Sequence, residues 1–494
     1  MRIDATELRA RVVGEGGNLG FTQRSRIEFA LAGGRINTDA IDNSGGVDCS
    51  DHEVNIKILL GLAVSDGEMT EKQRNKQLAE MTDEVGLLVL EDNYYQTQAL
   101  SVAGRSAAAL LDQEARLIHW LERAGRLKRA LEFLPADEEV VERKAAGLGL
   151  TSPERAVLLA YSKMWLYDEL LASSLPEDPL VAGLLPAYFP RPLRERHAEA
   201  MLRHPLRREI LSTHLTNTLV NRAGATFVHR MLEETDARPA DIVRACLIGR
   251  DVFGLEPLWA EIDALDNRVD DEVQARMFAA VGRLLEHASL WFLRHARAGG
   301  VQDGGESARY AEAAAWLTPQ LPALLAAPEA AALAERRQAL AQAGVDDALA
   351  LRVAAGEICA AALDIADVAA ATQRGLALVA SVYFALDTEF SFGWLRERAQ
   401  ALPADSHWDL LARTTALEDL GRLKRALTVS VLSQPVELDT TEKLIEAWRN
   451  GRQAQIERFS RMLADQRASG AAGLSMLSVA IREIGLLERS QPGC

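Results

Sequence analysis

The chain has 494 residues, of which 48% are hydrophobic and 26% are charged, and its formal net charge is -16. This composition is typical of a globular protein with two to four domains of roughly 150 residues each. The acidic balance argues against a nucleic-acid or anionic-membrane partner, because both need clustered Lys and Arg on one face.

Cysteine usage and hydropathy indicate a compartment for the protein. Its four cysteines are far apart and form no CxxC pair, which argues against a zinc site and a disulfide framework and fits a reducing environment. The N-terminus has no apolar signal-peptide core, and no run of about 18 apolar residues could span a bilayer. We therefore expect a cytoplasmic protein with no membrane partner.

The first fifty residues differ from the rest of the chain. Val12 and Val13 run into a glycine-rich turn at 14–17, and a second turn and strand are predicted at 33–37. Alternating strand, glycine turn and helix is typical of an α/β unit. A doubly wound sheet needs about five or six strands, whereas only one or two such units are present here. The sequence therefore predicts an N-terminal remnant of a Rossmann-like α/β doubly wound domain, so that the chain begins inside a domain.

Beyond about residue 70 the pattern is helical nearly to the end, so the predicted fold class is mainly α. Thr151 and Glu154 form a capping-box start, and Thr440 caps another predicted helix. We expect three regions: residues 1–100 as the C-terminal part of a nucleotide-binding catalytic domain, 101–300 as a helical domain, and 301–494 as a further helical region.

One heptapeptide, G-R-L-K-R-A-L, occurs twice, at residues 125–131 and 421–427. Two basic turns that bind anions are one interpretation. Two amphipathic helix starts with solvated arginines are the other, and we favour it because the sequences around the two copies do not match.

The glycine-rich segment 14–20 is not a dinucleotide phosphate loop, because GxGxxG would need glycine where Leu19 stands. Its glycines could still let the backbone approach a flat ligand at a strand end. A tight turn without a ligand explains the segment equally well.

The segment from Asn43 to Glu53 is the most informative stretch. Its spacing predicts Ser50 as a helix N-cap with Glu53 as capping-box partner. Free N–H groups at a helix start favour an anionic ligand, and a carboxylate bound there would accept a hydrogen bond from Ser50. The Asn43 amide can both donate and accept, which complements a carboxamide.

The same segment is rich in possible metal ligands, namely Asp48, Asp51, His52 and Glu53. Consecutive residues point around a helix rather than to one point, and HExxH fails because Ile56 stands at its last position. We therefore predict no metal site, and no catalytic triad is recognisable.

Together these segments resemble the glutamate dehydrogenase superfamily. Glu15 to Asn18 is similar to its E-G-A-N strand end, with Gly17 replacing alanine, and Asn43 to Glu53 is similar to its N-A-G-G-V-x-x-S-x-x-E. The surrounding residues narrow the resemblance to the large bacterial NAD-specific class, and the tail resembles that class at residues 131–135, 156–163, 206–210 and 221–228.

The resemblance implies NAD as cofactor, with Asn18 and Asn43 at the nicotinamide-ribose end and Gly16 and Gly17 giving backbone access. It implies that Ser50 holds the side-chain carboxylate of glutamate or 2-oxoglutarate, with ammonium as the other product. A homo-oligomer is also expected.

The family's catalytic lysine and aspartate and its GxGxxG loop lie upstream of these motifs, and none is recognisable here. We assign no catalytic residue in this chain. We expect a fragment that needs the rest of its own chain and is inactive alone. The alternatives are a helical scaffold or oligomerisation module with a vestigial dehydrogenase segment, and another amino-acid dehydrogenase of the superfamily.

Overall fold

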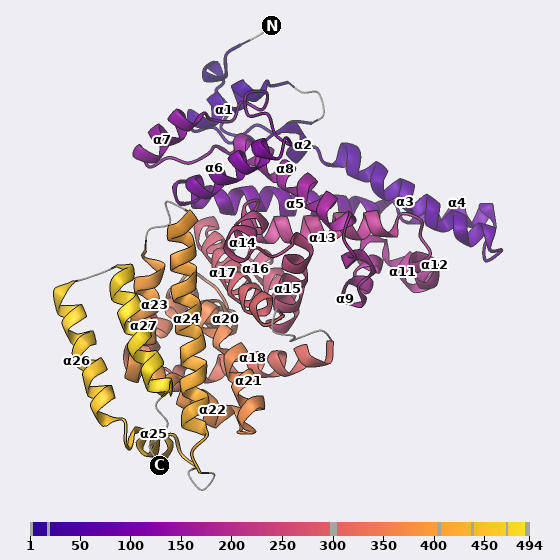
Figure 1. Ribbon diagram of the computed structural model, residues 1–494. Helices are drawn as coiled ribbons and strands as arrows, with labels where there is room; N and C mark the ends of the chain where they lie inside the picture. The colour runs from indigo at the N-terminus through magenta and orange to yellow at the C-terminus, as the bar shows by residue number, and fades with distance from the viewer. Residues whose placement is uncertain are drawn as a thin grey trace. The chain divides into compact units, whose positions relative to one another are not determined.

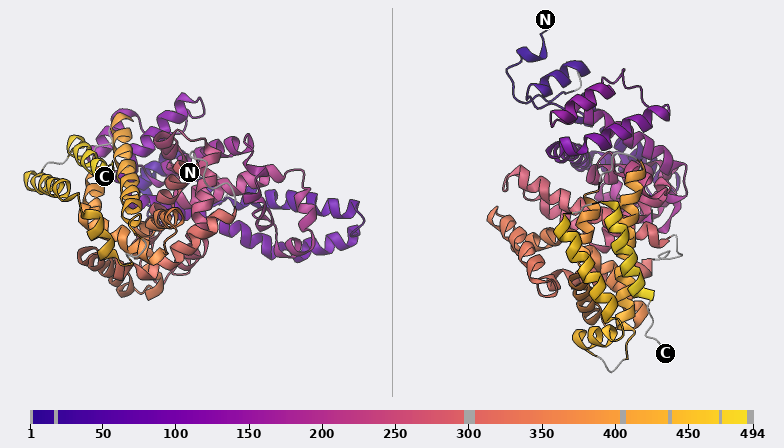
Figure 2. Two further views of the ribbon diagram at one scale, coloured as in Figure 1. Left: turned by 60° about the horizontal axis from the view of Figure 1, so that its bottom comes forward. Right: turned by 60° about the vertical axis from the view of Figure 1, so that its left-hand side comes forward.

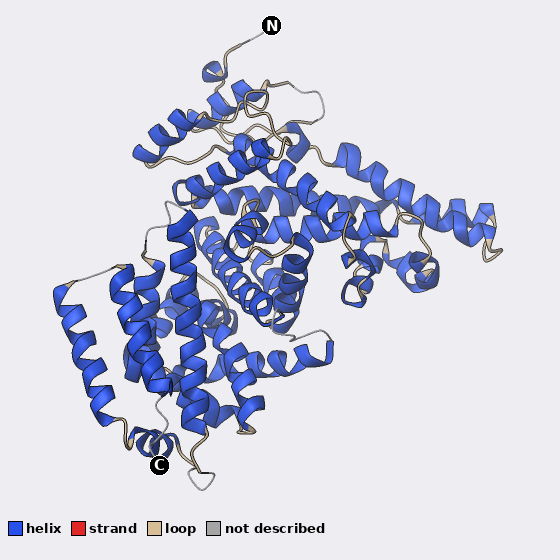
Figure 3. Ribbon diagram, viewed as in Figure 1, coloured by secondary structure: helices blue, strands red, loops and turns tan. Residues whose placement is uncertain are grey.

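The computed structural model describes residues 3–16, 20–296, 304–402, 407–435, 439–470 and 473–489. Within these ranges the regular elements are helices, and no strand is formed (Figure 3). The prediction of a mainly helical chain is therefore confirmed. Two compact units are present: unit 1 comprises Met1–Leu232 and Ala237–Leu247, and unit 2 comprises Glu233–Asp236 and Ile248–Cys494 (Figure 1).

The N-terminal segment pairs two extended stretches without forming a sheet. It contains η1 (Ala5–Glu7), α1 (Gln23–Leu31) and α2 (Asp39–Asp42). Val12 and Arg35 form an isolated parallel bridge, in which the Val13 amide donates to the Arg35 carbonyl at 2.9 Å. The strands predicted here are thus reduced to a single bridge. A lone pair of extended segments is marginal, because most of its backbone groups have no ladder partner.

Unit 1 is built around long helices separated by short proline-initiated ones. Pro179, Pro186 and Pro192 each stand in the first turn of a short helix, where the missing N–H costs nothing. Its elements after α2 are α3 (Gly45–Ser65), α4 (Glu71–Glu80), α5 (Thr82–Arg105), α6 (Ala107–Arg123), α7 (Asp137–Ala145), α8 (Ser152–Leu171), η2 (Leu175–Glu177), α9 (Pro179–Ala182), α10 (Leu185–Tyr188), α11 (Arg191–Arg196), α12 (Ala198–Leu202) and α13 (Arg207–Ala223).

Helix α8 lies at the centre of unit 1 and packs against α1, α5, α6 and α13. Its predicted capping box is confirmed, since Thr151 is the N-cap and Glu154 bonds back to the Thr151 amide at 2.6 Å. Glu154 is 1% exposed and accepts two hydrogen bonds from Arg143, at 2.7 and 2.8 Å. The cap and the buried ion pair together fix where α8 begins.

Helices α14 (Phe227–Thr235) and α15 (Pro239–Val252) have residues in both units. In unit 2, Thr440 caps the helix that the sequence predicts after it, accepting a hydrogen bond from the Lys443 amide. The elements of unit 2 are α16 (Leu255–Asp263), α17 (Asp271–Ala296), α18 (Gly304–Leu324), α19 (Ala327–Gln342), α20 (Asp347–Ala355), η3 (Gly356–Ala360), α21 (Ala361–Thr372), α22 (Leu376–Phe390), α23 (Phe392–Gln400), α24 (His407–Leu432), α25 (Thr441–Arg449), α26 (Gln453–Ser469) and α27 (Leu474–Arg489) (Figure 2).

Helix α24 is the centre of unit 2 and packs against α21, α22, α23 and α27. Its Lys424 is 3% exposed, forms an ion pair with Asp387 at 3.1 Å and lies 3.7 Å from the ring centroid of Tyr383. Burial lowers the pKa of Lys424 from 10.5 to about 8. A buried amine held by one carboxylate and a ring makes this core sensitive to pH.

The two copies of the repeated heptapeptide have different structures. Residues 125–131 lie in turns after α6, where Arg129 bonds to Glu122 at 2.9 Å and to Asp137 at 2.6 Å. Residues 421–427 lie inside α24. The prediction of two helix starts is therefore wrong for both copies, because the partners of each copy decide its conformation.

No single helix of the described ranges has the length and apolar character to cross a bilayer. The pair α22 and α23 meets those criteria only when joined across a 67° bend. Val379, Ala380 and Val382 of α22 are fully buried inside unit 2.

Candidate functional site

The candidate site lies at the junction of α2 and α3, which α5 holds in place. Asn93 of α5 donates to the Ile41 carbonyl at 2.8 Å and to Ser44 Oγ at 3.0 Å. Gln96, one turn later, also donates to the Ile41 carbonyl, at 3.1 Å. These side chains satisfy backbone groups where one helix ends and the next begins. The start of α3 is therefore set by a helix about fifty residues away in sequence.

A second set of contacts ties the glycine-rich segment to this junction. The Glu15 amide donates to Asp42 Oδ2 at 3.1 Å, and Asn37 donates to the other oxygen of Asp42 at 3.0 Å. Asn37 in turn accepts from Ser152 at the start of α8, at 2.7 Å. Gly16 follows Glu15 and Asn43 follows Asp42 in the chain, so the hydrogen bond between Glu15 and Asp42 brings Gly16 and Asn43 to the same region.

The Asn43 side chain is available for a ligand. It is partly exposed, and it makes no side-chain hydrogen bond to another residue that the structure describes. It lies over Gly46, where a β-carbon would stand 3.0 Å from Nδ2. Glycine at position 46 thus leaves room for the amide, which offers one acceptor oxygen and two N–H donors.

Ser50 lies inside α3 and does not cap it. The helix begins at Gly45 after Ser44, and the Ser50 hydroxyl donates to the Val47 carbonyl at 2.6 Å. Glu53 pairs with Lys57 instead of capping. The predicted capping box is wrong because Asn93 anchors Ser44 and allows the helix to start six residues earlier. Ser50 is exposed, so no helix of the described residues closes it in.

The remaining predicted cofactor residues are in the glycine-rich turn. Gly16 is exposed, and a β-carbon there would meet nothing within 4 Å. Its backbone is therefore accessible to a flat ligand. Gly17 and Asn18 lie outside the described residues.

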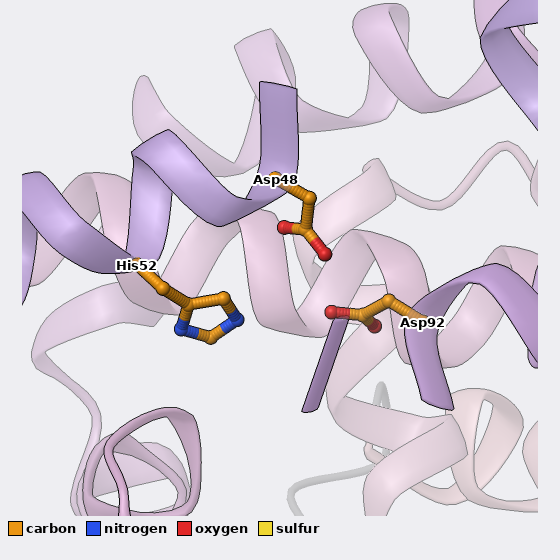
Figure 4. A group of neighbouring side chains, drawn as sticks. All are labelled: Asp48, His52 and Asp92. Atoms are coloured by element: carbon orange, nitrogen blue, oxygen red, sulfur yellow. The ribbon is translucent and has the colours of Figure 1, made fainter. Parts of the chain in front are cut away.

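The face of α3 opposite Ser50 carries a cluster of ionisable side chains. Asp48 and His52, one turn apart, meet Asp92 of α5 (Figure 4), and their nearest ligand atoms lie within 4.8 Å of one another. The prediction of no metal site rests on consecutive possible ligands of this segment diverging around the helix, and that reasoning does not apply to Asp48 and His52, because residues four apart share a helix face. The i, i+4 spacing could have identified the pair, whereas Asp92 required the tertiary structure.

Burial and like charges perturb this cluster. The pKa of Asp48 is raised to about 7 by burial and by Asp92 and Asp51, and the pKa of Asp92 is raised to about 6, mainly by burial. Burial also lowers the pKa of Lys163, on α8, to about 8. The negative charges of Asp92 and Asp48 offset only part of this lowering.

Comparison with known proteins identifies the family. A family model described as "Glutamate dehydrogenase, C-terminal" matches residues 147–485, and one described as "Bacterial NAD-glutamate dehydrogenase, catalytic domain" matches residues 1–103. The chain belongs to the bacterial NAD-specific glutamate dehydrogenases. NAD-specific glutamate dehydrogenases of Pseudomonas aeruginosa, Halomonas elongata and Mycobacterium tuberculosis are 43%, 41% and 39% identical over 100%, 98% and 99% of the chain. The chain spans about 30% of the length of each.

The two family models match different parts of the candidate site of this glutamate dehydrogenase chain. Asn43, Ser50 and the anchoring helix α5 up to residue 103 lie in the part matched to the catalytic domain. Helix α8, which holds Asn37 through Ser152, lies in the part matched to the C-terminal region. The C-terminal helices of this family member therefore support the catalytic-domain segment directly within unit 1.

Proposed function

We propose that this chain forms the cofactor and substrate edge of an NAD-dependent glutamate dehydrogenase, which converts L-glutamate, NAD and water to 2-oxoglutarate, ammonium and NADH. The observation that carries the proposal is the α2–α3 junction. The Asn43 amide, which has no side-chain hydrogen bond to the described residues, and the exposed Ser50 hydroxyl lie there, next to the helix start that α5 anchors and within the region matched to the catalytic domain.

Asn43 is proposed to bind the carboxamide of the nicotinamide ring. Bound NAD would supply the hydride acceptor of the reaction. The amide of Asn43 has both a donor and an acceptor, as pairing with a carboxamide requires. Gly16 is close in the chain to the Glu15–Asp42 bond, and its open backbone would let the ring approach. For Gly17 and Asn18 the proposal rests on the E-G-A-N-like motif alone.

Ser50 is proposed to donate its hydroxyl to the side-chain carboxylate of glutamate. The hydroxyl now bonds within its own helix, to the Val47 carbonyl. A rotation about the Cα–Cβ bond would redirect it outward, and a charged acceptor makes a stronger hydrogen bond than a carbonyl.

The bridge between Val12 and Arg35 is proposed to be the edge of a larger nucleotide-binding sheet. It is parallel, and helix α1 connects its two halves, as in a βαβ unit. The other strands, the catalytic lysine and aspartate and the GxGxxG loop would come from the rest of the polypeptide. The 494-residue chain alone is therefore expected to transfer no hydride.

The assignments of Ser50 and Asn43 are tested by exchanging them in the enzyme that contains this chain. Ser50→Ala is expected to raise KM for glutamate by about 10- to 150-fold, the equivalent of ~1.5–3 kcal/mol for a hydrogen bond to a charged group. KM for NAD should be unchanged. Asn43→Ala should show the reverse pattern, with KM for NAD raised.

Ser101→Ala is the matched control, because Ser101 is an exposed helical serine whose hydroxyl also bonds to a carbonyl of its own helix. It should change neither KM. Since Ser50 is no cap, Ser50→Ala should not lower the melting temperature, as alanine favours helix by a few tenths of a kcal/mol. An unchanged KM for glutamate would show that Ser50 has no substrate role.

The need for the rest of the polypeptide is tested by assaying the purified 494-residue chain. No glutamate-dependent NAD reduction is expected, while a polypeptide that also contains the upstream part of the family sequence should be active. Reduction by the 494 residues alone would refute the proposal that the catalytic groups lie elsewhere.

A further inference from the structure

The inner face of α3 holds the cluster of Asp48, His52 and Asp92, which the dehydrogenase reaction proposed above does not use. Asp48 and His52 project from one side of α3, and Asp92 reaches them from α5. Figure 4 shows the two carboxylates directed toward each other, with the imidazole beside them. The three side chains thus converge from two helices on one point.

The imidazole is the observation that points to a ligand. His52 is 2% exposed, and neither of its ring nitrogens has a hydrogen-bond partner within the described part of the chain. Asp48 Oδ2 is buried and lacks a partner as well. A buried polar atom without a partner costs about 1–3 kcal/mol. Such groups on facing helices require an explanation.

The rest of the surroundings orient His52 without satisfying its nitrogens. Its ring stacks on Tyr188, with centroids 4.5 Å apart. The Tyr188 hydroxyl is itself held, donating to Asp51 at 2.7 Å and accepting from Asn55 at 2.8 Å. These contacts hold the ring of His52, and one of its two nitrogens faces the carboxylates while the other points away from them (Figure 4).

Charge in the cluster is not balanced by a close cation. Lys163 is near enough to influence both carboxylates, yet it makes no ion pair within the 4.0 Å limit among the described residues. Asp48 and Asp92 therefore make no close ion pair with a described residue, and the His52 nitrogens beside them have no hydrogen-bond partner there.

We propose that Asp48, His52 and Asp92 bind a divalent transition-metal ion of the Zn²⁺ or Mn²⁺ class. Two carboxylate oxygens and one imidazole nitrogen are ligands that such ions accept. Atoms bound to one ion at about 2.1 Å lie at most about 4.2 Å apart. The ligand atoms here lie within 4.8 Å, so small side-chain rotations would close the site.

The ion would connect α3 to α5. Asp48 and Asp92 are partly exposed, so the ion can enter and water can complete its coordination. Asn93, next to Asp92, already anchors the start of α3. The metal would therefore stabilise the same helix pair that presents Asn43 and Ser50, on the face of α3 away from Ser50.

The test is calorimetric titration of the metal-stripped 494-residue chain with ZnCl₂, MnCl₂ and MgCl₂. One saturable site per chain is expected for Zn²⁺ or Mn²⁺, with much weaker Mg²⁺ binding because Mg²⁺ prefers oxygen ligands. Asp92→Asn and His52→Gln should each weaken this binding by on the order of 100-fold, since even outer partners contribute 10–100-fold. Glu53→Gln is the matched control, because Glu53 is exposed, pairs with Lys57 and should leave the affinity unchanged.

A second measurement, the melting temperature, distinguishes a folding defect from the loss of a metal ligand. Zn²⁺ or Mn²⁺ should raise the melting temperature of the unaltered chain and of Glu53→Gln but not of Asp92→Asn. No saturable binding up to 1 mM, or binding that Asp92→Asn and His52→Gln leave unchanged, would overturn the proposal. Neither result depends on hydride transfer, so the dehydrogenase proposal is tested separately.

Discussion

Replacing Asp364 by asparagine should destabilise unit 2 strongly, although the change is nearly isosteric. Asp364 is 7% exposed and accepts three hydrogen bonds from three different elements. Trp291 Nε1 and Arg425 Nη1 donate to Oδ1 at 2.7 and 2.8 Å, and the Tyr383 hydroxyl donates to Oδ2 at 2.8 Å. One carboxylate thus joins α17, α22 and α24 to α21.

The magnitude follows from what asparagine can still do at position 364. Its oxygen can keep the bonds from Trp291 and Arg425, and its NH₂ can donate to Tyr383, whose hydroxyl would then act as acceptor. The negative charge opposite Arg425 is lost. Removing one partner of a fully buried pair costs about 3–5 kcal/mol, and a hydrogen bond to a charged group is worth about 1.5–3 kcal/mol. Because the Arg425 side chain is 24% exposed, we expect a loss of about 2–3 kcal/mol.

Hydrogen exchange of α21 and α22 amides is the suitable assay, since a chain of two units need not unfold in one step. Asp367→Asn is the control on the same helix: its ion pair with Arg309 spans 3.6 Å, and the two side chains are 39% and 43% exposed. An exposed pair contributes about 0–1 kcal/mol. If the two variants lowered the opening free energy equally, the reasoning about the buried carboxylate would be wrong.

Two further predictions concern pH and packing. The pKa of Lys424 is about 8 in the folded chain and 10.5 in the unfolded chain. Between these pH values the unfolded chain binds more protons, so the free energy of unfolding should rise with pH by up to about 3 kcal/mol. Lys424→Met should abolish this rise in unfolding experiments at pH 7.5 and 10, and an equal slope in both proteins would contradict the assignment. Gly149→Ala would place a β-carbon 2.2 Å from the Ala107 carbonyl oxygen and should lower the stability of unit 1 by about 1–3 kcal/mol. Gly61→Ala should raise the stability by about 0.5–1 kcal/mol, because Gly61 lies inside α3 with open space where the β-carbon would stand. Thermal unfolding of both variants measures the difference, and a change of the same sign in both would refute this prediction.

Local signals in the sequence were sufficient where the chemistry of a few neighbouring residues decides the structure. The capping box of Thr151 and Glu154 and the cap at Thr440 predicted helix starts that the structure confirms. Each depends on a side chain that bonds to a backbone amide within three residues, so no distant partner is needed. The ordered motifs likewise predicted the family, because a family pattern is a property of the sequence itself.

The tertiary structure decided the features that depend on partners far along the chain. Asn93 anchors Ser44 and moves the start of α3 ahead of the predicted cap at Ser50, and Asp92 joins Asp48 from another helix. The heptapeptide at 125–131 and 421–427 is a turn in one copy and helix in the other. In the first copy Arg129 bonds to Glu122 and Asp137 at the edge of the turn, whereas Lys424 and Arg425 of the second pair with acidic side chains in the core of unit 2. Local propensity differs by only tenths of a kcal/mol between such states, while burial and paired charges contribute more, so the tertiary contacts determine the outcome.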